Sequence, residues 1–401
     1  MTPELADLIK MIGYTVAGWL VIKKLNGGWR EFAFAALNIG ILYLVFFHGA
    51  DSRYAPTFLA YLVLIVFQYT MLRIFAGKEG WKPWLAFFTP IVALILVRYV
   101  PPSLYGSRSF LYGPYFIGIS YLSFRCSHLV LEVRNGAVKM PGFFEYLNFS
   151  FFVPTMSVGP INPYSNFRRA FGAEPPSIPP ARAFLRILVG MVKYKFLGSI
   201  FFQLTYSDLL LDDYYHPWID LPIAVIFYYL FLYSNFSGFC DMAIGCAGLI
   251  GIPVIENFNN PFAARNMREF WNRWHISLSQ YMRDVCFSPL SKYFARLLGP
   301  ANINHAIALT IMVVFLLIGI WHGTGWNYVV FGFLNGIGVI VTHYYTIGLK
   351  KWLGREGFKA YNSNPWIRAV AVAVTFCYFA TTLFFFANTP EEMKQILSLM
   401  R

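Results

Sequence analysis

Residues 297–349 contain no lysine, arginine, aspartate or glutamate. A charge-free stretch of this length is predicted to lie in lipid, where backbone polar groups must be satisfied within helices or by other protein. His322 lies near its centre, in the sequence Gly-Ile-Trp-His-Gly-Thr-Gly-Trp. An ionisable side chain at membrane depth is costly and normally faces a protein interior or a wet cavity. His322 is therefore the first candidate for a functional residue.

The composition of the whole chain agrees with a membrane location. Of the 401 residues, 57% are hydrophobic and 13% are charged, whereas soluble domains are about 45–50% apolar and 25% charged. The net charge of +13 lies in short basic clusters between apolar runs, as in positive-inside membrane loops, so we expect no nucleic-acid partner. We predict an all-α polytopic membrane protein in which residues 1–401 form a single integral-membrane domain.

Several apolar runs approach the length of about 20 residues that a membrane span needs. The charge-free ones are Phe32–Ala50, Tyr54–Leu72, Leu221–Cys240 and Ala369–Pro390. Shorter or interrupted runs are Met11–Ile22, Pro83–Val97, Ser109–Phe124 and Ala183–Tyr206. Residues 297–349 add two more helices, separated by the glycine-rich segment around His322. We expect about ten to twelve membrane segments, some of them re-entrant.

Two regions fit neither a regular span nor a soluble loop. Residues Tyr146–Phe167 lack charge but contain three prolines and a glycine, which predict an irregular segment dipping into protein-lined membrane. In residues Glu256–Gly299, arginines and aromatic residues alternate too closely for a simple helix stripe. We predict short interfacial helices there.

Two histidines, His275 and His322, each follow a tryptophan, Trp274 and Trp321 respectively. Their separation in the sequence does not form a local metal motif, and we expect no metal site, but two segments of a helix bundle can bring them together. Buried indole N–H groups need partners, so the tryptophans are candidates to wall a pocket and hold an imidazole. For either histidine alone, a structural role, as a neutral ring bonded to a neighbouring helix, explains the sequence equally well.

Both histidine motifs resemble the signatures of the membrane-bound O-acyltransferase (MBOAT) family. Arg268–Ser279 reads Arg-Glu-Phe-Trp-Asn-Arg-Trp-His-Ile-Ser-Leu-Ser, and Trp-His-Gly follows at 321–323. The segments Asn-Phe-Asn-Asn-Pro-Phe at 257–262 and Tyr-Ser-Asn-Phe-Ser-Gly-Phe-Cys-Asp-Met-Ala-Ile-Gly at 233–245 resemble its bacterial branch. The resemblance implies membrane segments and interfacial helices around a central funnel.

Within this branch, the chain is most similar to the proteins that move D-alanine onto teichoic acids. Phe270–His275, Leu129–Gly136 and the short length of the chain carry this likeness. Asp241 is more typical of the branch that O-acetylates alginate or peptidoglycan, and Asn235 replaces an aspartate common to both branches. The sequence therefore leaves two alternatives for the acyl group, D-alanyl and acetyl.

The resemblance implies transfer of an activated acyl group across the cytoplasmic (inner) membrane to a cell-envelope acceptor. The donor is expected to be a phosphopantetheine carrier-protein thioester or acetyl-coenzyme A, with no resident cofactor. Besides the lipid bilayer, the expected partners are an acyl carrier protein and either an extracytoplasmic acyltransferase or a cell-envelope polymer.

Acyl transfer to a hydroxyl needs a base and a polar group for the developing oxyanion. His322 is the expected base, and His275 is expected to orient a substrate or stabilise charge. Expected substrate contacts are Asn272, Arg273, Trp274, Trp321 and Asp241, although a structural role is the stronger expectation for Asn272, Arg273 and Asp241. A transporter or flippase is the alternative from another class, but the two broken segments do not repeat one another as in transporters.

Overall fold

The computed structural model describes residues 3–47, 54–100, 116, 118–172, 178–206 and 216–399. Within these residues the chain is helical, and the one β-type pairing is an isolated antiparallel bridge between Phe258 and Trp274. The predicted all-α class is confirmed. The backbone forms two compact units, Met1–Met191 with Phe239–Ile255 and Val192–Gly238 with Glu256–Arg401. The long helix α11 (Pro217–Ile250) contributes residues to both.

Seven of the described helices are long and apolar enough to cross a membrane. They lie at Gly27–Phe47, Ala55–Phe75, Lys82–Tyr99, Trp218–Ile250, Pro300–His322, Trp326–Ser363 and Pro365–Ala387. Each overlaps an apolar run singled out in the sequence, so the chain is a multi-pass membrane protein. The total of ten to twelve segments stays a prediction. Part of one predicted segment, residues 109–115 and 117, and the end of another, residues 48–50, lie outside the described residues.

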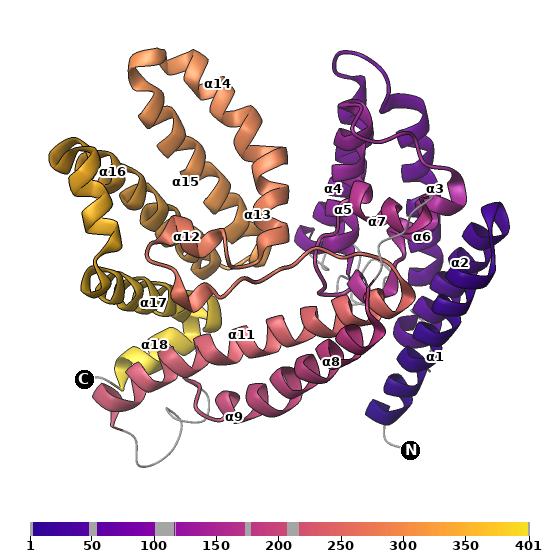
Figure 1. Ribbon diagram of the computed structural model, residues 1–401, viewed down its shortest axis with the longest axis horizontal. Helices are drawn as coiled ribbons and strands as arrows, with labels where there is room; N and C mark the ends of the chain where they lie inside the picture. Colours follow the sequence, from indigo (N-terminus) through magenta and orange to yellow (C-terminus); the bar gives the residue numbers. More distant parts are fainter. Residues whose placement is uncertain are drawn as a thin grey trace. The chain divides into compact units, whose positions relative to one another are not determined.

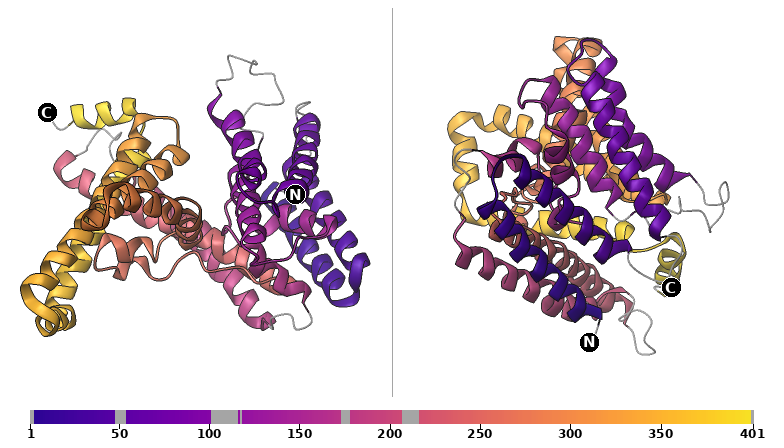
Figure 2. Two further views of the ribbon diagram at one scale, coloured as in Figure 1. Left: turned by 90° about the horizontal axis from the view of Figure 1, so that it is seen from above. Right: turned by 90° about the vertical axis from the view of Figure 1, so that its right-hand side faces the viewer.

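The first unit contains most of the N-terminal helices. In order they are α1 (Pro3–Lys24), α2 (Gly27–Leu42) with the π-helical turn η1 (Tyr43–Phe47), α3 (Tyr54–Phe75), α4 (Lys82–Tyr99), α5 (Ile119–Arg134), α6 (Phe143–Ser150), the 3-10 turn η4 (Val153–Thr155), α7 (Tyr164–Phe167), the 3-10 turn η5 (Arg168–Phe171) and α8 (Pro180–Met191). Helices α1 and α2 run side by side, as both views of Figure 2 show.

The proline-containing segment after α6 is irregular, as predicted. Arg125 of α5 is 1% exposed and stabilises this backbone from within the unit. Its guanidinium donates to the carbonyl oxygen of Ser150 at 2.9 Å and to Thr155 Oγ1 at 3.0 Å. Ser150 ends α6, where carbonyl groups have no partner within the helix. A buried arginine thus satisfies a carbonyl group at the helix end and binds a side chain of the irregular segment.

The second unit contains the C-terminal helices and the region between Glu256 and Gly299. Its elements besides α11 are the π-helical turn η6 (Val192–Leu197), α9 (Gly198–Phe202), the 3-10 turn η7 (Pro261–Ala263), α12 (Met267–Trp271), α13 (Ile276–Met282), the π-helical turn η8 (Arg283–Phe287), α14 (Ser288–Leu298), the 3-10 turn η9 (Pro300–Asn302), α15 (Ile303–His322), α16 (Trp326–Ser363), α17 (Pro365–Ala387) and α18 (Pro390–Ser398). The short α12 and α13 lie beside α15, α16 and α17 (Figure 1). The prediction of short helices in this region is confirmed.

Helices α15 and α16 form a close antiparallel hairpin joined by residues 323–325. Two glycines set their separation, because a Cβ atom on Gly319 would clash with the carbonyl oxygen of Tyr328, and one on Gly332 with that of Phe315. Small residues at such crossings let membrane helices approach closely. Since His322 follows Gly319 by one turn of α15, this crossing positions the histidine.

We expect Gly319→Ala to destabilise the protein, because the added methyl group must push α15 and α16 apart. Overpacking of this kind costs about 1–3 kcal/mol, measurable as a lower thermal inactivation temperature of the purified protein. Gly348→Ala is the matched control, since a Cβ there meets no atom within 4 Å, and alanine favours a helix by up to about 1 kcal/mol. Equal stability of Gly319→Ala and wild type would contradict the close crossing.

Candidate functional site

His275 lies at the turn between α12 and α13 in a left-handed backbone conformation, with φ 44° and ψ 53°. This region is unfavourable for a residue with a side chain and persists only where surrounding contacts enforce it. The N–H of Ile276 donates to the carbonyl of Asn257 at 3.0 Å, and the N–H of Asn259 donates to the carbonyl of Arg273 at 2.9 Å. The preceding segment thus fixes the backbone on both sides of His275.

The side chain of Asn257 determines which nitrogen of His275 carries the proton. Its Oδ1 atom lies 3.1 Å from the backbone N of Ser277, 2.8 Å from Ser277 Oγ and 3.1 Å from His275 Nδ1. A backbone N–H can only donate, so the Asn257 atom at this point is the carbonyl oxygen. His275 Nδ1 must then donate as well. The neutral imidazole therefore carries its hydrogen on Nδ1 and a lone pair on Nε2.

His275 Nε2 is buried and has no hydrogen-bond partner among the described residues. The imidazole is 3% exposed and lies against the ring of Phe236 of α11, with centroids 4.7 Å apart and the planes nearly perpendicular. Burial, which disfavours the imidazolium, and to a smaller extent the neighbouring His322 together lower the pKa of His275 to about 3. A neutral, unpartnered acceptor in an apolar wall is suited to receive a hydrogen bond from a substrate.

Trp321 brings the two histidine motifs together within the second unit. Its ring centroid lies 6.3 Å from that of His275 and 4.5 Å from that of His322. His322 is the last residue of α15, is half-buried, and packs edge-on against Phe386 at 4.9 Å. The two imidazoles, far apart in the sequence, therefore share one aromatic neighbour.

Trp274, the residue before His275, has a packing role. It is buried, stacks on Phe270 at 5.6 Å, and contacts Phe258 at 5.1 Å and Phe379 at 5.4 Å. These rings belong to the segment before α12, to α12 and to α17. Trp274 thus anchors the turn in the core of the second unit.

Asn272 and Arg273 contact the backbone and side chains that form the turn. The Arg273 guanidinium donates to Glu269 Oε1 at 2.8 Å and to the carbonyl of Asn259 at 3.2 Å. Burial by itself would raise the pKa of Glu269, but hydrogen bonds from Arg265 and Arg273 outweigh it and hold this pKa below its usual value. Asn272 is exposed and accepts from Arg283 at 3.3 Å.

Asp241 belongs to the first unit, whereas both histidines belong to the second. There it forms an ion pair with Arg186 of α8, at 2.9 Å from the guanidinium Nη2 and 3.0 Å from Nε. Gly245, one helical turn further along α11, is so close to α8 that a Cβ would meet Ile187 and the carbonyl of Ala183. The described contacts of Asp241 thus connect α11 to α8.

Sequence reasoning assigned no role to Asn257 or Phe236, although both lie in segments noted for their resemblance to the family. The signal for Asn257 was an asparagine opening an Asn-Phe-Asn-Asn-Pro-Phe segment shortly before the Trp-His pair. A buried amide in an aromatic-rich segment must find partners, and His275 and Ser277 supply them. Nothing in the sequence states which segment meets which, so this pairing emerges only in three dimensions.

The depressed pKa of His275 predicts acid-sensitive stability. Unfolding restores a pKa of about 6.5, so the unfolded chain binds an extra proton between about pH 6.5 and 3. Stability is complete above that window and falls as the pH drops through it, by about 2 kcal/mol at pH 5. We expect the thermal midpoint to fall from pH 7 to pH 5 more steeply for wild type than for His275→Asn. Asparagine tolerates the left-handed backbone. Parallel pH dependences would contradict this prediction.

Comparison with known proteins identifies the class to which this site belongs. A family model described as MBOAT, membrane-bound O-acyltransferase family, matches residues 84–385, which include both histidine motifs. The chain belongs to the membrane-bound O-acyltransferase family and is an O-acyltransferase.

The relatives include two kinds of enzyme, D-alanyltransferases and an O-acetyltransferase. A teichoic acid D-alanyltransferase of Streptococcus thermophilus is 31% identical over 367 residues, 86% of each chain. A teichoic acid D-alanyltransferase of Bacillus subtilis is 30% identical over 288 residues, 69% of each chain. A peptidoglycan O-acetyltransferase of Helicobacter pylori is 32% identical over 170 residues, 42% of this chain and 29% of that protein.

Proposed function

We propose that this chain transfers a D-alanyl group from a carrier-protein thioester, across the cytoplasmic membrane, to a hydroxyl of a cell-envelope polymer. The observation that carries the proposal is the pairing of His275 and His322 around Trp321 in a membrane O-acyltransferase. The D-alanyl group is favoured because the likeness to the D-alanyltransferase of Streptococcus thermophilus extends over 86% of both chains. The likeness to the peptidoglycan O-acetyltransferase covers 29% of that longer protein.

The proposed reaction joins the acceptor hydroxyl oxygen to the carbonyl carbon of the thioester and breaks the carbon–sulfur bond. His322 takes the hydroxyl proton as the new bond forms and returns it to the departing sulfur, which leaves as the carrier thiol. A histidine is suited to both steps because its ordinary pKa lies near neutrality. A thioester is an activated acyl donor, so its transfer to a hydroxyl needs no further co-reactant.

The role proposed for His275 is to orient a substrate. Its Nδ1–H donates to Asn257 Oδ1, so the neutral ring has only the Nε2 lone pair for a hydrogen bond with a substrate. It can accept a hydrogen bond from the acceptor hydroxyl or from the ammonium of a D-alanyl group, but in this form it cannot donate to an oxyanion. Trp321 then forms the wall between the two imidazoles. Trp274, Asn272 and Arg273 act by holding the turn on which His275 lies.

The experiment that tests this function is label transfer by the purified protein in lipid vesicles. One set of vesicles receives carrier protein loaded with radiolabelled D-alanine, and a second set receives radiolabelled acetyl-coenzyme A, each with a polymer acceptor. We expect label to leave the D-alanyl carrier and to reach the acceptor. Label leaving acetyl-coenzyme A instead would assign the chain to O-acetylation. No transfer from either donor, with folded protein and a competent acceptor, would contradict the proposal.

A further inference from the structure

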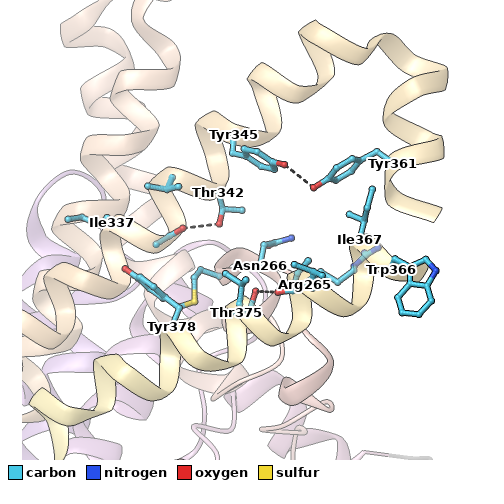
Figure 3. Close-up of a pocket in the computed structure, with 16 residues that line it drawn as sticks. Arg265, Asn266, Ile337, Thr342, Tyr345, Tyr361, Trp366, Ile367, Thr375 and Tyr378 are labelled. Atoms are coloured by element: carbon cyan, nitrogen blue, oxygen red, sulfur yellow. Dashed lines mark hydrogen bonds between the residues drawn. The ribbon is translucent and has the colours of Figure 1, made fainter. Parts of the chain in front are cut away.

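A cleft of about 640 Å³ lies in the second unit, away from the two histidines. It is bounded by α16, by the start of α17 and by the residues that lead into α12 (Figure 3). Gly354 interrupts α16 with a φ of +66°, so the end of this helix turns back and carries Tyr361 over the cleft. The hydroxyl groups of Tyr345 and Tyr361 meet there at 2.8 Å. The cleft therefore has walls on three sides.

Most of this cleft is apolar and opens where the helices face outward. Val341 of α16 and Val370 and Val374 of α17 line it, and each is about 60% exposed (59%, 63% and 62%). Both helices are membrane spans by length and composition. In a bilayer, side chains so exposed on spanning helices contact hydrocarbon, so this part of the cleft is open to acyl chains.

At one end the cleft continues into a second hollow of about 330 Å³, and the two share Arg265, Thr342 and Tyr345. Arg268 and Arg368 also line this second hollow, and no aspartate or glutamate lines it. Arg265 is partly neutralised by Glu269 at 3.0 Å. Arg268 contacts an imidazole nitrogen of His343 at 2.9 Å, and Arg368 forms no ion pair within the described part of the chain. The hollow is thus cationic.

The cationic end also has the features of a membrane–water interface. Trp366, in the first turn of α17, lines the cleft and is 80% exposed. Tryptophan is enriched at the headgroup level of a bilayer. Guanidinium groups bind phosphate through two parallel hydrogen bonds. The cleft therefore runs from a hydrocarbon-facing part to a cationic part whose guanidinium groups are suited to a phosphate.

We propose that this cleft binds an anionic phospholipid, with its phosphate on Arg268 and Arg368 and an acyl chain between α16 and α17. Charge complementarity favours this occupant over a second copy of the chain, since a chain of net charge +13 brings mainly cations to a cationic surface. The volume of the cleft, about 640 Å³, also lies within the range of about 300–1,000 Å³ typical of small-molecule sites. Because Arg268 lies in α12, which leads to the His275 turn, the bound headgroup also restrains the segment that carries His275.

The test is photo-crosslinking of the full chain in vesicles of phosphatidylcholine and phosphatidylglycerol at 3:1. In parallel samples, one of the two lipids carries a diazirine on its acyl chain. We expect the phosphatidylglycerol probe to label peptides of residues 366–378 at least about five-fold more than the phosphatidylcholine probe. Arg368→Gln should remove this preference. Ala371 lines both hollows, so Ala371→Phe, which adds a ring at their junction, should lower labelling by both probes.

Arg296→Gln is the matched control, because Arg296 is exposed on α14 and lines neither hollow. It should leave the labelling ratio unchanged. Equal labelling by the two probes in wild type would overturn the proposal, as would an undiminished phosphatidylglycerol preference in folded Arg368→Gln. Crosslinks between two copies of the chain at these peptides would assign the cleft to self-association instead. The crosslinking readout does not depend on acyl transfer. A failure of the lipid proposal can therefore be distinguished from a failure of the proposed function.

Discussion

Replacing His322 by alanine is expected to lower the rate of acyl transfer by at least about 100-fold, while the chain still folds and inserts. General acid–base catalysis by one side chain contributes about 10²–10⁴-fold, and no other described imidazole except His275 packs against Trp321. His275 cannot substitute, because a base must become protonated and burial disfavours the imidazolium form of His275, whose pKa is lowered to about 3. The measurement is the initial rate of label loss from the acyl donor in vesicles.

His322→Gln separates chemistry from packing, since glutamine keeps much of the volume beside Phe386 but cannot take a proton. It should be as inactive as His322→Ala. His305→Ala is the matched control on the same helix, because His305 is exposed in the first turn of α15 and bonds to Tyr344. It should retain the wild-type rate. A His322→Gln protein with wild-type activity would refute the assignment of His322 as base.

Asn257→Ala is expected to lower both stability and activity, because it removes one oxygen that accepts three hydrogen bonds. The N–H and hydroxyl of Ser277 and the Nδ1–H of His275 would be left buried, at a cost of about 1–3 kcal/mol for each unsatisfied group. The imidazole would also lose the bond that fixes its tautomer. We expect a thermal midpoint lowered by several degrees and acyl transfer reduced by more than about 10-fold.

Asn257→Asp distinguishes a positioning role from a merely structural one. A carboxylate keeps the acceptor oxygen, so stability should recover in part, but its negative charge favours imidazolium and raises the pKa of His275. The acid limb of the pH–rate profile should therefore move to higher pH than in wild type. Asn259→Ala is the control, since the exposed side chain of Asn259 lies two residues further along the same segment. An unshifted profile in an active Asn257→Asp protein would argue against the role.

The helices were predictable where one local property dominates. Residues 217–250 and 365–387 are apolar over a full membrane thickness, and such runs form helices because lipid offers no partner for backbone polar groups. The irregular segment after α6 was predictable for a similar reason, since proline lacks the N–H that a helix needs. The bend of α16 at Gly354 was not predictable, because a single glycine in a helical run does not indicate a positive φ.

The candidate site also has features that local sequence predicts and features that depend on tertiary packing. The sequence by itself determined that the chain is a membrane protein, that His275 and His322 are its chemically active candidates, and which family it resembles. Only the tertiary structure decided that Trp321 lies against both imidazoles, that Asn257 sets the tautomer of His275, and that the ion pair of Asp241 lies in the other unit. The physical reason is that the cost of charge in lipid depends on composition along the chain. A hydrogen bond or ring contact between distant segments depends instead on how the helices pack.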